Sequence, residues 1–323
     1  MALGNQQEYG LDYEETFTPV AKMTTIRTIM ALAVSKGWSL RQMDVKNAFL
    51  HGDVKEAIFM SPPPGLFPPS SVEVCRLKRS LYGLKQALRA WFEKFHTTLL
   101  DFTFTQSQYD SSLFFCKTAI GIVILLVYVD DIVITRYDFP LIEQLQQHLK
   151  SSFHMKDLGP LQYFLGLEVQ HCPNGMLLHQ HKYTQELLSL AGLQDSNSVL
   201  TPMEVNLKLH QAGGDSLSDP SMYRWLVGSL NCLTITQPDI SFVVQQVSQF
   251  MQTPCQTHLA AVCRLLRYLK GTSGHGLFFP SGNSLKLEGF SDADWAGCVD
   301  TRRSVTGWCM FLGDALISWK SKK

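Results

Sequence analysis

Two adjacent aspartates, Asp130 and Asp131, interrupt a strongly apolar stretch over residues 122–134. The flanking side chains are mainly β-branched or large aliphatic ones, a composition typical of buried strands. Because an unpaired carboxylate is costly to bury, we expect the chain to fold back here and to carry both carboxylates at the tip of a hairpin. Two carboxylates this close remain ionised most readily beside a cation, and a divalent metal ion with oxygen ligands is the obvious candidate. Aspartate is also a common turn residue, so the hairpin alone leaves a plain turn open.

A third aspartate, Asp44, lies near the end of a short strand predicted over residues 39–45. It precedes the doublet by 130 − 44 = 86 positions, so only the fold can bring these carboxylates together. Three converging carboxylates suit two divalent ions about 4 Å apart, which clamp the attacking and leaving oxygens of a phosphoryl transfer. Taken alone, Asp44 also fits a simple cap at the end of a strand.

A basic segment over residues 76–91 lies between Asp44 and the doublet. Lysine and arginine side chains contact phosphates, while Tyr82 and Trp91 offer stacking or packing surfaces. Gly83 would let the backbone approach a ligand closely. The alternative is the solvated start of a cationic helix, with Trp91 in the core.

Composition limits the classes of protein that remain. The chain has 323 residues, 45% of them hydrophobic and 17% charged, which predicts two or three domains with a sizeable core. A net charge of +0 gives no general indication of nucleic-acid binding. The eight cysteines lack zinc-like spacing and predict reduced thiols. The longest apolar stretch is too short to span a bilayer and no signal peptide is visible, so we expect an intracellular, cytoplasmic protein without a membrane partner.

Periodicity predicts the elements that must position these residues. Helices are expected over residues 23–37, 83–101, 141–153, 182–191, 222–233, 239–251 and 258–270. Hairpins are expected over residues 112–135 and 163–180, with a turn between them at 155–160. Short strands are expected over residues 285–290, 306–312 and 315–319, and the polar stretch 195–221 predicts a linker.

The doublet motif Tyr128-Val129-Asp130-Asp131 is one of a series of ordered motifs. The others cover residues 12–20, 44–52, 80–87, 155–159, 163–166, 226–230, 237–240 and 291–297. Together they resemble the reverse transcriptases of copia-type LTR retrotransposons over nearly the whole chain.

This resemblance implies an α+β fold. The expected architecture is a right-hand polymerase with palm, fingers and thumb and an antiparallel palm sheet, followed by a helical connection and a truncated ribonuclease H-like β segment. The implied boundaries are a fingers and palm region over 1–195, a linker with a helical thumb or connection over 196–275, and an incomplete ribonuclease H-like segment over 276–323.

The resemblance also implies an RNA-directed DNA polymerase. Such an enzyme extends a DNA primer on an RNA or DNA template with deoxynucleoside triphosphates, in virus-like particles, and uses two Mg²⁺ ions, with Mn²⁺ as a substitute. Carried over by position, Asp44 and Asp130 are the principal metal ligands and Asp131 is the third carboxylate. Phe49 stacks under the incoming sugar and excludes a 2′-hydroxyl.

The remaining implied roles concern the nucleotide, template and primer. Residues that match the nucleotide- and template-binding positions are Gly83, Lys85, Gln86 and Tyr128. Leu165 and Gly166 match the hairpin that grips the primer end. Lys156 fits a proton donor for the departing pyrophosphate, and it fits a plain surface lysine equally well.

Several departures from the family pattern leave a second reading open. The chain starts inside the expected fingers region, Leu88 replaces a usual proline and Arg136 a usual glycine. Asp292 matches the first ribonuclease H carboxylate, but no glutamate follows Glu288, so ribonuclease H activity is expected to be absent. The alternative is a truncated, catalytically inactive relic that at most binds nucleic acid. An unrelated two-metal phosphatase or nuclease is a more distant third reading, because it leaves the basic segment unexplained.

Overall fold

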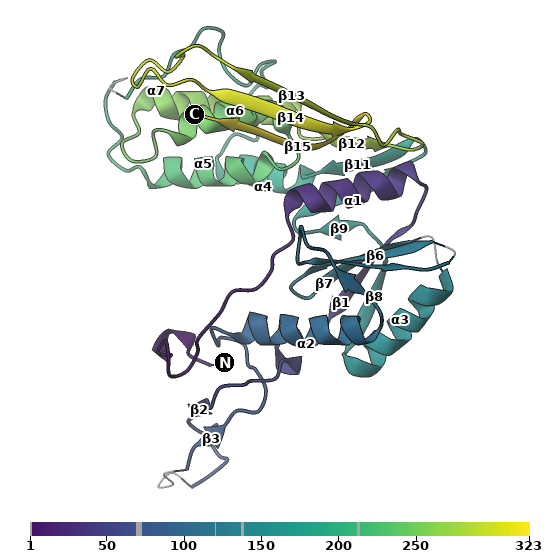
Figure 1. Ribbon diagram of the computed structural model, residues 1–323. Helices are drawn as coiled ribbons and strands as arrows, with labels where there is room; N and C mark the ends of the chain where they lie inside the picture. Colours follow the sequence, from purple (N-terminus) through teal and green to yellow (C-terminus); the bar gives the residue numbers. More distant parts are fainter. Residues whose placement is uncertain (1, 69–72, 120, 137–138, 212–213) are drawn as a thin grey trace. The chain divides into compact units, whose positions relative to one another are not determined.

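The computed structural model describes residues 2–68, 73–119, 121–136, 139–211 and 214–323 (Figure 1). The chain divides into two compact units. Unit 1 comprises residues 1–26 and 38–161, and unit 2 comprises residues 27–37 and 162–323. Helix α1 (Met23–Ser35) begins in unit 1 and continues in unit 2. The three-part division over residues 1–195, 196–275 and 276–323 stays a prediction.

An antiparallel sheet of six strands forms the centre of unit 1, in the order β4-β5-β6-β7-β1-β8. Its strands are β1 (Leu40–Val45), β4 (Thr105–Gln106), β5 (Leu113–Lys117), β6 (Ile122–Tyr128), β7 (Asp131–Arg136) and β8 (Met155–Pro160). The smaller elements of this unit are η1 (Gly4–Gln6), η2 (Ala48–His51) and the ribbon of β2 (Phe59–Met60) and β3 (Cys75–Arg76).

Helices α2 (Ala87–Asp101) and α3 (Phe139–Ser152) cover one face of this sheet (Figure 1). Their apolar side chains pack on Met43 and Val45 of β1 and on alternate residues of β6 and β7. Side chains alternate along a strand, so the residues between them point to the opposite face. Asp44 and Asp131 therefore belong to the face turned away from α2 and α3.

The described part of unit 2 combines two antiparallel sheets with several helices, in addition to most of α1. One sheet has the order β12-β11-β10-β9, with β9 (Tyr163–Phe164), β10 (Leu167–Cys172), β11 (Gly175–His179) and β12 (Gly276–Pro280). The other has β13 (Leu287–Ala293), β14 (Thr306–Leu312) and β15 (Ala315–Lys322). The helices are α4 (His181–Leu190), α5 (Ser221–Leu233), α6 (Ser241–Ser248), which follows η3 (Pro238–Ile240), and α7 (Gln256–Gly271).

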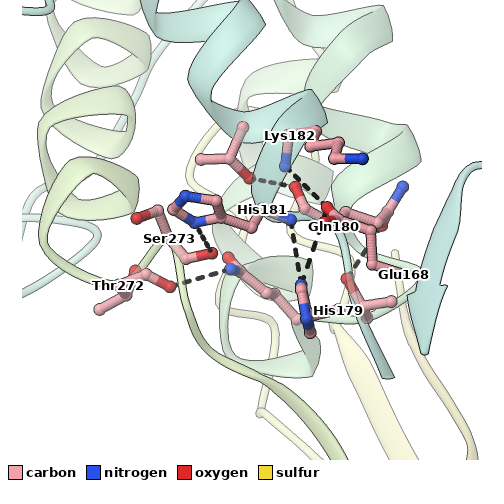
Figure 2. A network of polar contacts seen from close by, with 10 residues as sticks. Glu168, His179, Gln180, His181, Lys182, Thr272 and Ser273 are labelled. Carbon is pink, nitrogen blue, oxygen red and sulfur yellow. Dashed lines mark hydrogen bonds and ion pairs between the residues drawn. The ribbon is translucent and has the colours of Figure 1, made fainter. Parts of the chain in front are cut away.

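The helices of unit 2 share an apolar core that includes Leu187, Tyr223, Leu230 and Leu266. A polar network joins the β10–β11 hairpin to the start of α4 (Figure 2). In it, the backbone N–H of Lys182 donates to Glu168 Oε1 at 2.7 Å, which places a carboxylate at the positive end of the helix. Within the described ranges, no helix is both long and apolar enough to cross a bilayer.

The predicted mixture of helices and antiparallel strands is confirmed, and several details of the expected elements are wrong. Residues 155–160 form strand β8 and not a turn, because they pair with β1 through a register shift that accommodates Gly159 at φ 82°. Helix α2 begins at Ala87, since Gly83 at φ 98° keeps the preceding residues in a loop. Strand β12 was not expected.

Candidate functional site

Pairing between β1 and β7 brings the predicted carboxylates together. Asp44 lies directly opposite Asp131 in the antiparallel register, so both project from the same face of the sheet. The backbone N–H of Val45 donates to the carbonyl oxygen of Asp130 at 3.0 Å. The 86-residue separation is therefore closed by strand pairing, which places Asp130 and Asp131 beside the end of β1.

The chain folds back at the doublet through a two-residue loop, Val129-Asp130, between paired Tyr128 and Asp131. Val129 has φ 56° while Asp130 does not have a positive φ. A positive φ at only the first loop residue is the pattern of a type II′ turn, which normally has glycine there. A β-branched residue in this region is a genuine outlier, and such strain is typical of functional sites.

The carboxylates influence one another electrostatically. Burial, followed by the charge of Asp130, raises the pKa of Asp44, while Lys156 and Lys46 act in the opposite direction. Burial also raises the pKa of Asp131, and the neighbouring aspartates add to this effect. Carboxylates that repel each other in this way form the kind of donor set that a divalent cation neutralises.

The carboxylate of Asp131 forms a hydrogen bond with a side chain of the neighbouring strand β1. Gln42 Nε2 donates to Asp131 Oδ1 at 2.9 Å, which favours the ionised form of the carboxylate and opposes the effect of burial on its pKa. Among the residues that the structure describes, no three or more His, Cys, Asp or Glu side chains form a group that could hold a metal ion. Magnesium bound together with substrate phosphates needs only one or two protein carboxylates, and Asp44 with Asp130 fits that requirement.

The Tyr82 ring lies near these carboxylates, and the ring of Phe49 packs against it. Phe49, in η2, has its ring centroid 4.7 Å from that of Tyr82. Burial, followed by the charges of Asp130 and Asp44, raises the pKa of the Tyr82 hydroxyl. Sequence reasoning treated Tyr82 only as a stacking or packing surface, and its position between two motif residues, Leu81 and Gly83, was the available signal for a role in the site.

The predicted nucleotide-binding loop forms hydrogen bonds with residues 7–13 of the N-terminal segment. Lys85 Nζ donates to the Gln7 carbonyl at 3.2 Å and to the Tyr13 hydroxyl at 3.0 Å. The buried Gln86 side chain accepts from Gln7 Nε2 at 3.0 Å and donates to the Asp12 carbonyl at 2.8 Å. The polar groups that the resemblance assigns to a nucleotide or template are therefore bonded within the chain in this structure.

The other predicted site residues occupy three places. Tyr128 is half-buried and pairs with Asp131 at the base of the doublet loop. Leu165 and Gly166 form the loop between β9 and β10 in unit 2. Asp292 is exposed on β13, opposite Gly307, and lines an open pocket of about 570 Å³ with the aromatic residues Trp308 and Trp319. The roles assigned to all of these residues stay predictions.

Trp91 is an additional residue at the doublet. It belongs to α2, is only 1% exposed, and its indole Nε1–H donates to the Val129 carbonyl oxygen at 2.7 Å. The sequence left core packing and stacking open for this residue, and the structure places it in the core with a hydrogen bond to the loop.

Comparison with known proteins agrees with the motif series. The family model described as "Reverse transcriptase (RNA-dependent DNA polymerase)" matches residues 1–205. The retrovirus-related Pol polyprotein from transposon RE1 of Arabidopsis thaliana is 45% identical over 100% of this chain. The corresponding polyprotein from transposon TNT 1-94 of Nicotiana tabacum is 40% identical over 99% of the chain. The match covers 22% and 25% of these two polyproteins, respectively.

A shorter relative matches over most of its own length. The putative transposon Ty5-1 protein of Saccharomyces cerevisiae is 32% identical over 87% of this chain and 92% of the yeast protein. With the family model covering more than half of the chain, these similarities confirm the resemblance to copia-type Pol polyproteins. The chain belongs to the reverse transcriptase (RNA-dependent DNA polymerase) family.

Proposed function

We propose that this chain carries the RNA-directed DNA polymerase activity of a copia-type retrotransposon. The observation that supports this most strongly is the β1–β7 register, which sets Asp44 opposite Asp131 and leaves Asp130 in the loop at the end of the same strands. Its substrates would be a DNA primer on an RNA or DNA template and deoxynucleoside triphosphates.

Asp44 and Asp130 would hold the metal ions, and Asp131 would contribute its negative charge from beside Gln42. Two bound Mg²⁺ ions supply activation of the primer 3′-hydroxyl and neutralisation of the triphosphate and pyrophosphate charge. The residues themselves mainly position the substrates and balance charge. Phe49 and Tyr82 offer an apolar floor for the sugar, and the exposed Lys156 lies beside Asp44 in the β1–β8 register, within range of a phosphate bound at the site.

We further propose that the six-stranded sheet of unit 1 is the polymerase palm, and that β13–β15 is the ribonuclease H-like segment. Three antiparallel strands with Asp292 on the first of them support the second assignment. The palm assignment is supported by the position of all three carboxylates at one end of neighbouring strands.

The alternative function is binding of nucleic acid without catalysis. It is favoured by the hydrogen bonds that occupy Lys85 and Gln86, because these contacts with Gln7, Asp12 and Tyr13 must open before either side chain can touch a nucleotide. The replacement of a usual glycine by Arg136 supports it as well.

Primer extension separates these two functions. The full chain should incorporate deoxynucleotides on a primed RNA template when Mg²⁺ is present, as measured by extension of a labelled primer. Asp130→Asn should reduce the rate by at least about 10²-fold, because it removes one metal-binding charge. The matched control is Asp101→Asn, which changes an exposed aspartate at the end of α2 and should retain the rate.

The outcomes are distinct for the two readings. A folded sample without any incorporation contradicts polymerase activity. Salt-sensitive binding of the same primer–template without extension would instead support the non-catalytic function, since salt dependence reports phosphate contacts.

A further inference from the structure

Two related turns are available to a two-residue loop such as Val129-Asp130, and they differ by a flip of the central peptide group. Two-residue hairpin loops favour type I′, with positive φ at both residues, or type II′, with positive φ only at the first. The two turns differ in the orientation of the central peptide group, whose carbonyl here belongs to Val129. Whatever holds this carbonyl therefore sets the orientation of the peptide that links Val129 to Asp130, and with it the sign of φ at Asp130.

The indole of Trp91 holds this carbonyl from the helix side. Its Nε1–H donates to the Val129 oxygen at 2.7 Å, and the side chain is almost completely buried. The next carbonyl, that of Asp130, accepts from the backbone N–H of Val45 on β1 at 3.0 Å. Both carbonyls of the loop residues are thus held by groups outside the hairpin, one from α2 and one from β1.

The indole is fixed in its orientation by the surrounding rings. Phe153 lies edge-on, with ring centroids 5.1 Å apart, and Phe95 lies at 5.3 Å. A donor held by such packing loses little freedom when it forms the hydrogen bond, and a hydrogen bond in a buried environment is costly to break. Both turns require a positive φ at Val129, which valine disfavours, so the residue type at this position stabilises neither of them.

We propose that Trp91 is a positioning residue for the metal-binding carboxylate, because its indole N–H holds the Val129–Asp130 peptide in one orientation and so fixes the loop that carries Asp130. This inference rests on the proposed polymerase function for its consequence in catalysis. Its structural part, the selection of the turn by Trp91, stands independently of that function.

Removal of the indole donor tests the proposal. Trp91→Phe keeps an aromatic ring, and benzothienylalanine at the same position keeps the bicyclic shape while it replaces the N–H by sulfur. Both variants should lower kcat for primer extension by about 10- to 100-fold, because misplacement by about 1 Å has effects of this size. The KM for the nucleotide should change by less than about threefold, since contacts with the base and sugar remain.

The matched control is Leu99→Ala, about two helical turns further along α2 in the same core. It removes buried side-chain volume without touching the loop or the rings around the indole, so it should lower the unfolding temperature and leave kcat nearly unchanged. Equal losses of kcat in Leu99→Ala and in the benzothienylalanine variant would overturn the proposal and indicate general loosening of the core.

A crystal structure of the benzothienylalanine variant gives a readout that does not depend on activity. The central peptide of the loop should be flipped or present in two orientations, with positive φ at Asp130 in the new one. An unchanged Val129 carbonyl would overturn the inference even if the parent protein extends primers. An inactive parent protein with a flipped peptide in the variant would instead contradict the polymerase function and retain the role of Trp91 in the turn.

Discussion

The hairpins β6–β7 and β9–β10 both have two-residue loops, and they reach their conformations by different means. Leu165 and Gly166 have φ values of 54° and 80°, the type I′ pattern, with glycine at one of the two strained positions. Val129-Asp130 has a positive φ only at a β-branched residue and no glycine. The β9–β10 loop is favoured by its own sequence, whereas the β6–β7 loop depends on hydrogen bonds from Trp91 and Val45 in neighbouring elements.

This difference agrees with the proposed roles of the two loops. A conformation imposed from outside can place a carboxylate where local preference would not, and proteins accept such strain at functional sites. The β9–β10 loop needs no such support, and the structure around it is secured by the polar network that joins β10 and β11 to α4 (Figure 2).

The largest expected effect on stability comes from that network. Gln180 Oε1 accepts from the hydroxyl of Thr236, which is fully buried, at 2.9 Å. Gln180→Leu should lower the free energy of unfolding by about 2 kcal/mol, because it leaves that hydroxyl without its acceptor. Denaturant titration checks this. The double variant with Thr236→Val should recover most of the loss, and a full additive loss would contradict the assigned pair.

Substitution of the loop glycine should have the next largest effect. Gly166→Ala should destabilise the protein by about 1 kcal/mol, because its φ of 80° is strained for any residue with a side chain. A Cβ added there meets nothing within 4 Å, so the effect reports backbone conformation alone. The matched control is Gly228→Ala within helix α5, which should stabilise the protein. The same sign for both variants in thermal unfolding would refute this account.

In the doublet loop, a substitution that relieves a positive φ should raise the stability of the protein. Val129→Gly should stabilise the protein by about 0.5 kcal/mol, because the strain that it removes exceeds the entropic cost of glycine in the unfolded chain. The same variant should extend primers more slowly, since a flexible loop no longer fixes Asp130. Asn47→Gly is the control, because asparagine at φ 52° is far less strained. A loss of stability in Val129→Gly would show that the loop is not strained.

The smallest expected effect on stability concerns Asp157 in β8, the strand that pairs with β1 on the side opposite β7. Burial alone would raise the pKa of Asp157, but hydrogen bonds from the Gly159 N–H and from Arg41 outweigh it and lower the pKa. Because the pKa of Asp157 is lower in the folded state, its ionised form stabilises the fold at neutral pH. This stabilisation is lost as the pH falls below 3.8 through the folded-state pKa.

Asp157→Asn should therefore destabilise the protein by roughly 0.5 kcal/mol at pH 7, and the difference from the parent should shrink toward low pH. Unfolding curves at several pH values measure this. A difference for Asp157→Asn that grows on acidification would contradict the assignment.

Much of the site could be predicted from local patterns. The apolar stretches around Asp130 and Asp131 were sufficient to predict two strands with the carboxylates at their junction, and the position of Asp44 near a strand end followed from its neighbours. Strand β8 was missed because Gly159 and Pro160 are typical of turns, whereas pairing with β1 overrides that preference. The burial of Gln86 was missed because its partners, Gln7 and Asp12, are more than 70 residues away.

The sequence by itself determined the family, the antiparallel strands and the identity of the three carboxylates, because these depend on residue type and on short-range periodicity. Only the tertiary structure decided which groups surround those carboxylates. The donor of Trp91, the amide of Gln42 and the ring of Tyr82 reach the site from α2, β1 and the loop before α2. Hydrogen-bond direction and burial arise when separate elements pack together, and no local pattern encodes them.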